Sequence, residues 1–335
     1  MKQIQQYTAI IEREGSGFIT FCPELDIASQ GDTVEEAKSN LVEAIELVWE
    51  VADLSEGQSR YMSVTNVAKR RGTILDEIMA YHRERLPKRM RETPLADLRA
   101  LVSVAPLPDD FYAALQALGV SLIAECKKAS PSKGLMVPDY DAVQLAQTYA
   151  KAGARAISVL TDGRHFQGSL ADLRDVKEAV GQIPVLRKDF IFDPYQVYEA
   201  RAAGADAILL ITAVLSDNEL QSLLKLTHQL SMNALIEVHT REELERVLPL
   251  QPRIIGVNNR NLQTFQVDFE NTARLRAMIP PEIVTVAESG LKTEADVRRM
   301  AEIGVDAVLV GETLVTSKNV YRTAVKFVKA GWAKA

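Results

Sequence analysis

The chain has 335 residues, of which 47% are hydrophobic and 25% charged, so it can form a large core and is not a disordered protein. Its two cysteines, Cys22 and Cys126, are too few for a disulfide framework and predict a reducing, cytoplasmic location. The first residues lack the apolar segment of a signal peptide, and no apolar run reaches the roughly 18 residues of a membrane span, so we expect neither feature.

The formal net charge of −6 is unevenly distributed. Residues 1–65 contain four basic and twelve acidic side chains, whereas residues 66–335 contain 35 basic and 33 acidic ones. The negative charge therefore belongs to the front of the chain. Because an acidic surface repels phosphate, we do not expect this part to bind nucleic acid.

The sequence pattern of residues 1–62 predicts a small α+β module. Its expected strands are Tyr7–Ile11, Phe18–Cys22 and a shorter Ile27–Gln30. The glycines at positions 15 and 17 predict a hairpin connection between the first two. Tyr61–Thr65 is either a fourth strand or part of a linker, which we place over residues 63–73.

A helix follows in this module. Thr33 and Glu36 have capping-box spacing, and apolar residues then recur on one face as far as Val48. The module resembles the small domain of HicB-like antitoxins, and the matching stretches are Tyr7–Glu14, Cys22–Leu25 and Ser29–Ala37. The resemblance implies either a protein partner or self-association through residues 1–62, or a fused domain that has no remaining partner.

Residues 74–335 predict a (β/α)8 barrel with an N-terminal helical extension. The extension contains a helix from Ile74 to Tyr81 and further helix within Pro94–Leu118, interrupted by a loop at Pro106 and Pro108. The expected strands are Leu122–Lys127, Ala156–Leu160, Pro184–Lys188, Ala207–Ile211, Ala234–Val238, Ile254–Val257, Val284–Ala287 and Ala307–Val310. The expected helices are Asp141–Ala152, Leu170–Val180, Tyr195–Ala203, Asp217–Leu230, Arg241–Leu248, Phe269–Met278, Glu294–Ile303 and Val320–Ala330.

The first of these strands carries two charges on one face. Glu125 and Lys127 are two residues apart, so both point the same way at the barrel mouth. The loop from Ser130 to Gly134 that follows is rich in small residues and suits an anion. A structural ion pair followed by an ordinary turn is the alternative.

The third strand ends in Lys188, Asp189 and Phe190. A lysine in a partly apolar mouth is a candidate general acid, because desolvation lowers its pKa, and the phenylalanine would supply an aromatic wall. The alternative is that Lys188 and Asp189 form a solvated pair.

Glu237 closes the fifth strand and is a candidate base, whereas we expect His239 beyond the strand, at the surface. The other histidines do not have the spacing of metal ligands, so no metal site is expected.

Polar residues and glycines also follow the last three strands. Asn258 and Arg260 suit a hydroxyl and an anion, with loop capping as the alternative. The loops Glu288–Gly290 and Gly311–Thr313 follow strands seven and eight, where this fold commonly binds phosphate. Two ordinary turns are the alternative.

Taken together, these segments resemble the indole-3-glycerol phosphate synthase family over about Ile74 to Ala330. The motifs that carry the resemblance are Ile123–Ser132, Ser158–Gly168, Leu186–Ile191, Leu235–Val238, Ile255–Leu262 and Ala287–Gly290. The family closes an indole ring from 1-(2-carboxyphenylamino)-1-deoxyribulose 5-phosphate with loss of carbon dioxide and water. The resemblance implies a sugar phosphate that carries an anthranilate ring as the substrate, and no metal or organic cofactor.

The resemblance also implies roles for individual residues. Lys188 would be the acid for ring closure, while Glu237 and Lys127 would serve the later proton transfers. The residues that would orient the substrate are Glu125, Asn258 and Glu288. Those that would hold its phosphate are Ser130, Arg260, Ser289, Gly290, Gly311 and Glu312, and those that would wall its aromatic ring are Phe166, Phe190 and Leu210.

Two other functions compete with this one. A phosphate-sugar isomerase such as phosphoribosylanthranilate isomerase usually ends its strands with a Cys or Asp pair, whereas here strands one and three end in lysines. An antitoxin-like fusion, in which the barrel is only a scaffold, predicts instead that residues 1–62 bind a toxin or nucleic acid.

Overall fold

A computed structural model describes residues 5–14, 17–22, 27–52, 62–67, 74–261 and 266–332 of the chain. It divides the chain into two units, Met1–Thr73 and Ile74–Ala335. Part of the predicted hairpin connection, residues 15–16, lies outside the described residues. No helix in the described ranges is both long and apolar enough to cross a membrane.

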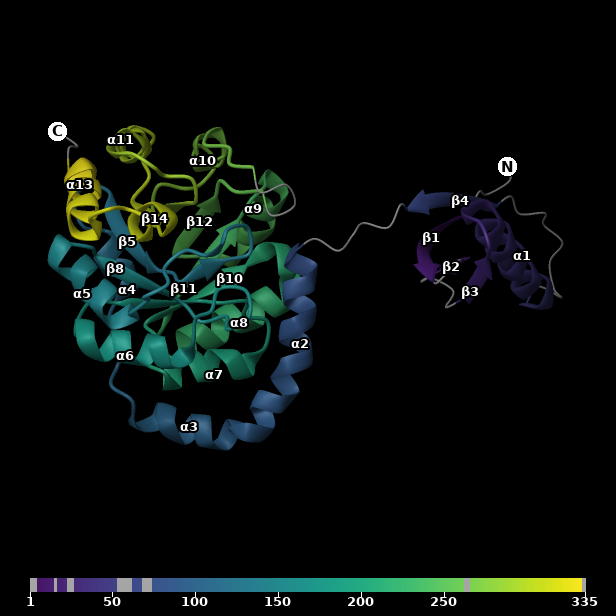
Figure 1. The fold of residues 1–335 in the computed structure, drawn as a ribbon, viewed down its shortest axis with the longest axis horizontal. Coiled ribbons are helices and arrows are strands. Elements are labelled where there is room, and N and C mark those ends of the chain that lie inside the picture. Colours follow the sequence, from purple (N-terminus) through teal and green to yellow (C-terminus); the bar gives the residue numbers. More distant parts are fainter. Residues whose placement is uncertain are drawn as a thin grey trace. The chain divides into compact units, whose positions relative to one another are not determined.

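The front unit is a four-stranded sheet with one helix packed against it (Figure 1). Its elements are β1 (Gln5–Glu14), β2 (Gly17–Cys22), β3 (Ile27–Gly31), α1 (Val34–Ala52) and β4 (Met62–Val67). The strand order is β3-β2-β1-β4, with β1 antiparallel to β2 and parallel to β4. Ala9 and Cys22 pack on Leu41 and Ile45 of the helix, which confirms the predicted apolar face.

The start of α1 and the fourth strand bear on two predictions. Glu36 donates its backbone N–H to the Thr33 hydroxyl at 3.1 Å, and its carboxylate accepts the N–H of Asp32 at 3.0 Å. Strand β4 extends to Val67, so residues 63–67 are sheet and not the linker that we predicted. This stretch is a strand because pairing with β1 satisfies backbone groups that a linker would leave to water.

The second unit is a closed parallel barrel of eight strands, as the sequence predicts. The strands are β5 (Ser121–Cys126), β8 (Ala156–Leu160), β9 (Val185–Lys188), β10 (Ala207–Ile211), β11 (Asn233–Val238), β12 (Ile254–Asn258), β13 (Val284–Glu288) and β14 (Ala307–Val310). A small hairpin, β6 (Ala129–Ser130) and β7 (Gly134–Leu135), follows the first of them.

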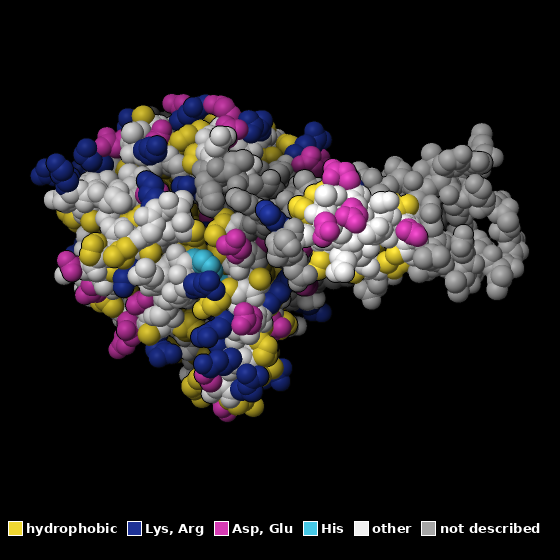
Figure 2. Space-filling view, turned by 45° about the vertical axis from the view of Figure 1, so that its right-hand side comes forward, with side chains coloured by type: hydrophobic (Ala, Val, Ile, Leu, Met, Phe, Trp, Pro, Cys, Tyr) yellow, Lys and Arg dark blue, Asp and Glu magenta, His cyan; other side chains and the backbone are white. Residues whose placement is uncertain are grey.

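Helices surround these strands (Figure 1). Their bounds are α2 (Ile74–Glu92), α3 (Leu95–Val104), α4 (Phe111–Leu115), α5 (Ala142–Ala152), α6 (Leu170–Val180), α7 (Pro194–Ala202), α8 (Asp217–Gln229), α9 (Arg241–Val247), α10 (Glu270–Arg276), α11 (Glu294–Glu302), α12 (Glu312–Val315) and α13 (Val320–Trp332), with 3-10 turns at Thr212–Val214 and Leu248–Leu250. On the face drawn in Figure 2, basic and acidic side chains of the barrel are interspersed, in keeping with its nearly balanced charge.

The strands separate two cores because successive side chains point to opposite faces. Leu209 and Ile211 of β10 belong to the core inside the barrel, where Phe111 and Leu115 of α4 also pack. Leu210 belongs to the larger core between strands and helices, as does Cys126. This alternation decides which residues reach the mouth of the barrel.

Candidate active site

The carboxyl ends of the barrel strands surround a cavity of about 360 Å³, a size usual for small-molecule sites. Most of the residues that the sequence predicts for the site line this cavity together. They are Glu125, Lys127, Ser130, Phe166, Lys188, Phe190, Glu237, Asn258, Arg260, Glu288, Ser289, Gly290, Gly311 and Glu312.

Leu210 is the exception, and its predicted position was wrong. Its neighbours Leu209 and Ile211 line the cavity, whereas Leu210 is buried on the opposite side of β10, against the helices. The error is one residue of strand register, which reverses the face of a side chain. Leu209 and Ile211 supply the apolar wall that we assigned to Leu210.

Lys188 lies at the centre of the charged groups. Its Nζ is 3.4 Å from Oε2 of Glu237 and 3.4 Å from Oε2 of Glu288. Burial alone would lower its pKa, but the negative charges of these two carboxylates and of Glu125 raise it. Our expectation of a lowered pKa was therefore wrong, and Lys188 carries its proton throughout the neutral range.

The two carboxyl groups beside Lys188 differ in protonation. Burial raises the pKa of Glu288 to about 8, since the attraction of Lys188 is opposed by the nearby charges of Glu237 and Glu125. Burial also acts on Glu237, but Lys188 and His239 outweigh it and lower the pKa of that carboxyl group. Near neutral pH, Glu237 is an ionised base and Glu288 holds a proton.

Two glycines make room for the carboxyl groups. A Cβ atom on Gly256 would lie 2.1 Å from Oε1 of Glu288, and one on Gly311 would lie 2.3 Å from Oε1 of Glu125. Oε1 of Glu125 is in turn 3.3 Å from Nζ of Lys127. Gly311 is thus required by Glu125 in addition to its predicted place at a phosphate.

We expect Gly256→Ala to lower stability by about 1–3 kcal/mol and kcat by roughly tenfold, because the new methyl group overpacks the barrel and displaces the Glu288 carboxyl group from Lys188. Urea unfolding and steady-state kinetics measure the two effects. Gly163→Ala is the control, since a Cβ there meets only an ordinary contact of 3.6 Å. Equal behaviour of the two variants would contradict the prediction.

The loops that follow β5, β12, β13 and β14 present groups suited to an anion. Ser130 is buried, and its hydroxyl forms no hydrogen bond with the residues that the structure describes. Arg260 and Lys133 both face Glu312, with nitrogen–oxygen distances of 3.7 and 2.5 Å. Ser289 and Gly290 have φ angles of 66° and 82°, a left-handed backbone that turns the chain sharply after β13.

Comparison with known proteins identifies the family of this site. The family model described as indole-3-glycerol phosphate synthase matches residues 75–327. An indole-3-glycerol phosphate synthase of Dehalococcoides mccartyi is 54% identical over 250 residues, which cover 74% of this chain and 96% of the relative. One of Roseiflexus is 50% identical over 256 residues, which cover 74% of this chain and 95% of the relative.

The chain belongs to the indole-3-glycerol phosphate synthase family. Among solved structures, a 3-hexulose-6-phosphate synthase aligns with a TM-score of 0.52 at 13% identity, covering 63% of this chain and 99% of that one. That likeness concerns the fold alone.

The synthase cavity has an aromatic side. The rings of Phe166 and Phe190 have centroids 6.3 Å apart, and Nζ of Lys127 lies 5.6 Å from the centre of the Phe166 ring. A flat ring between these walls would also be within reach of a cation.

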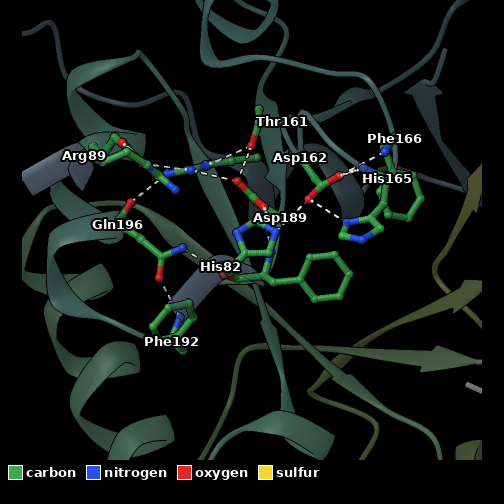
Figure 3. Close-up of polar contacts among 12 residues, drawn as sticks. His82, Arg89, Thr161, Asp162, His165, Phe166, Asp189, Phe192 and Gln196 are labelled. Atoms are coloured by element: carbon green, nitrogen blue, oxygen red, sulfur yellow. Dashed lines mark hydrogen bonds and ion pairs between the residues drawn. The ribbon is translucent and has the colours of Figure 1, made fainter. Parts of the chain in front are cut away.

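Behind the aromatic walls of this synthase lies a buried polar network that the sequence did not reveal (Figure 3). Nε2 of His82, on α2, lies 2.7 Å from Oδ2 of Asp162 and 3.8 Å from Oδ1 of Asp189. Asp189 also accepts hydrogen bonds from Thr161 at 2.6 Å and from Arg187 at 2.8 Å. The alternative of a solvated Lys188–Asp189 pair was therefore wrong: Asp189 is buried and pairs with Arg187, whereas Lys188 pairs with Glu237 and Glu288.

This network fixes the loops that carry the walls. Asp162 accepts the backbone N–H of Phe166 at 3.0 Å, and Asp189 accepts that of Phe190 at 2.9 Å. Burial opposes ionisation of Asp162, but its hydrogen bond from His82 and those from the backbone lower its pKa to about 2. The helical extension of the synthase thus holds both phenylalanines through His82.

His239 lies beyond β11, as the sequence predicts, but its side chain is not at the surface where we expected it. Its side chain is only 10% exposed, and its Nε2 lies 3.4 Å from Oε1 of Glu237. The two-residue spacing from Glu237, which places both side chains on one face, was the available signal.

Proposed function

We propose that the barrel converts 1-(2-carboxyphenylamino)-1-deoxyribulose 5-phosphate to indole-3-glycerol phosphate, the carboxy-lyase step of tryptophan biosynthesis that its family catalyses. The observation that carries the proposal is the cavity within the matched residues, in which a protonated Lys188 lies between Glu237 and Glu288. This arrangement offers an acid and a base to one substrate.

The cavity suits both ends of this substrate. Its anthranilate ring would lie between Phe166 and Phe190, with Leu209 and Ile211 as further apolar contacts. Its phosphate would bind through Ser130, Arg260, Ser289, Gly290 and the backbone of Gly311 and Glu312.

We assign the proton transfers as follows. Lys188 protonates the ketone oxygen while the ring carbon that bears the carboxylate attacks the ketone carbon. Loss of carbon dioxide then restores the aromatic ring. Glu237 removes a proton from the carbon next to the nitrogen, and Lys127 protonates the hydroxyl that leaves as water. The former ketone oxygen thus receives two protons, one from Lys188 and one from Lys127, and the carbon next to the nitrogen gives one proton to Glu237. Each turnover therefore takes up one proton from solvent.

Purified full-length chain incubated with this substrate tests the proposal. We expect indole fluorescence to appear together with stoichiometric release of carbon dioxide. A folded chain that yields no indole would exclude the proposed function, and an isomerase would give a product without loss of carbon dioxide.

We expect Glu237→Gln to lower kcat by about 10²-fold or more, since the amide cannot accept the proton, whereas Glu288→Gln should keep at least roughly a tenth of wild-type activity at pH 7. Glutamine resembles the protonated carboxyl group that Glu288 already is below a pKa of about 8. Rates of indole formation between pH 6 and 9 check both variants. Equal losses would show that the two carboxyl groups do not differ in role.

The front unit is proposed to be HicB-like, since it has the predicted strands followed by the capped helix. We place the connection to the barrel after Val67, within residues 68–73. We also propose that the protein is located in the cytoplasm.

The edge strands of a small sheet can pair with another chain, which favours pairing between two copies. Analytical sedimentation of the full chain tests whether two copies associate, and a chain that is monomeric at all concentrations would exclude this pairing.

A further inference from the structure

Lys188 by itself does not determine which carboxyl group acts as the base. Its Nζ is 3.4 Å from Glu237 and 3.4 Å from Glu288, and the two carboxyl side chains are only 3% and 2% exposed. Both groups therefore have the same cation at the same distance and nearly the same burial. Any difference between them must come from a third group.

Glu125 acts on Glu288 and Asn258 on Glu237, but His239 is the positively charged group that differs between the two carboxyl groups. Its Nε2 faces Oε1 of Glu237 at 3.4 Å, on the carboxyl oxygen that does not face Lys188. In the described part of the chain, the only ion pair of Glu288 is the one with Lys188. The arrangement around Lys188 is thus symmetric in distance but not in charge.

The imidazole is held in this position from outside the cavity. Its Nδ1 is 3.3 Å from Oε2 of Glu243 on α9, and its backbone N–H donates to the same oxygen at 2.6 Å. Asn271 of α10 donates to the backbone carbonyl of His239 at 3.0 Å. Nε2 is buried and forms no hydrogen bond with any described residue, and its ion pair among them is with Glu237.

We propose that His239 is a positioning residue that selects Glu237, rather than Glu288, as the base of the reaction by holding a positive charge against its Oε1. This rests on the proposed function, in which a base is needed for the last step. The titratable groups that face the imidazole are the carboxyl groups of Glu237, Glu243 and Glu288. Burial would favour the neutral ring, but these carboxylates raise the pKa of His239 and favour the imidazolium.

The sign of the effect follows from the charges. An imidazolium beside Glu237 favours the ionised carboxylate and lowers its pKa, so Glu237 is a base at lower pH than it would be alone. Without that charge, Glu237 and Glu288 would share Lys188 more equally. Glu237 would then hold a proton over part of the neutral range and fail as a base there.

His239→Gln tests the proposal, because it removes the charge and keeps a polar side chain. We expect the acidic limb of the kcat–pH profile to move to higher pH by about one unit, so that kcat near pH 7 falls by roughly tenfold. KM should change by less than about twofold. Glu243→Gln should move the limb in the same direction by less, since it acts only through His239. His228→Gln on α8 is the matched control and should leave the profile unchanged.

The outcomes separate this proposal from the proposed function. Wild-type chain that forms indole, with a His239→Gln profile that superimposes on the wild type, would overturn the role of His239 alone. Infrared titration of the carboxyl groups, with Glu237→Gln to assign the band, does not depend on turnover. It should show a higher pKa for Glu237 in His239→Gln, and an unchanged value would overturn the proposal even for a chain that is inactive on this substrate.

Discussion

Lys188→Met is expected to lower kcat for indole formation by at least about 10³-fold, near the upper part of the range for a positioned acid. The substitution removes the proton donor and also the cation that lies 3.4 Å from both Glu237 and Glu288. Without that cation the two buried carboxyl groups face each other, and the pKa of Glu237 rises. One substitution therefore removes the acid and weakens the base.

Lys188→Arg separates these two contributions. A guanidinium keeps the positive charge between the carboxyl groups but does not give up its proton in proteins. We expect it to be nearly as inactive as Lys188→Met, while Lys151→Met on the surface of α5 leaves kcat unchanged. If Lys188→Arg kept more than about a tenth of wild-type kcat, Lys188 would act by charge and not as an acid. Circular dichroism confirms folding of each variant.

The polar part of the cavity could be predicted because a parallel barrel brings the carboxyl ends of all its strands to one mouth. Glu125, Glu237 and Glu288 each interrupt an apolar run, so the sequence marks both the end of the strand and the face. Lys188 follows such a run directly after Arg187, which marks the end of the strand. The run Ala207–Ile211 contains no such marker, and nothing in it distinguished Leu210 from its neighbours.

The environment of these residues could not be predicted in the same way. His82 lies 80 positions before Asp162, and only the folded chain brings them together. Arg187, directly before Lys188, did give a signal: alternation places it on the face away from the cavity, where a buried charge needs a partner. The pKa of Lys188 was misjudged because desolvation was considered without the three carboxylates.

Strand β4 of the front unit could not be predicted from its own sequence pattern. Residues 62–67 alternate too weakly to be separated from a linker by pattern alone, and the strand exists because β1 offers it an edge. Residues that pair between β1 and β4 are 57 positions apart, for example Gln5 and Met62, so this pairing is a property of the whole module.

Arg187→Met should have the largest effect on the stability of the barrel, a loss of about 3–5 kcal/mol. The guanidinium is 1% exposed. It donates to Thr161 at 3.1 Å, to the carbonyl of Gln196 at 2.9 Å and to Asp189 at 2.8 Å. Its ion pair with Glu199 has a nitrogen–oxygen distance of 2.9 Å. Methionine fills much of the volume but leaves the buried carboxylates of Asp189 and Glu199 without this cation, and such uncompensated charge is what makes the loss large.

The pH dependence of this loss distinguishes the charge from the packing. Burial raises the pKa of Asp189, but Arg187, His82 and the hydrogen bonds to its carboxylate lower it overall. A depressed carboxyl pKa stabilises the fold above the unfolded value of about 4, and this contribution is lost as the pH falls through the folded value. The difference in the free energy of unfolding between wild type and Arg187→Met, measured with urea, should therefore be largest at pH 7 and decrease as the pH is lowered.

Arg274→Met is the control. It breaks an exposed ion pair with Asp268 and should lower the free energy of unfolding by less than about 1 kcal/mol. If Arg187→Met lowers the free energy of unfolding by as little as Arg274→Met does, or by an amount that does not vary with pH, the network behind Phe166 and Phe190 is held by packing and not by its charges.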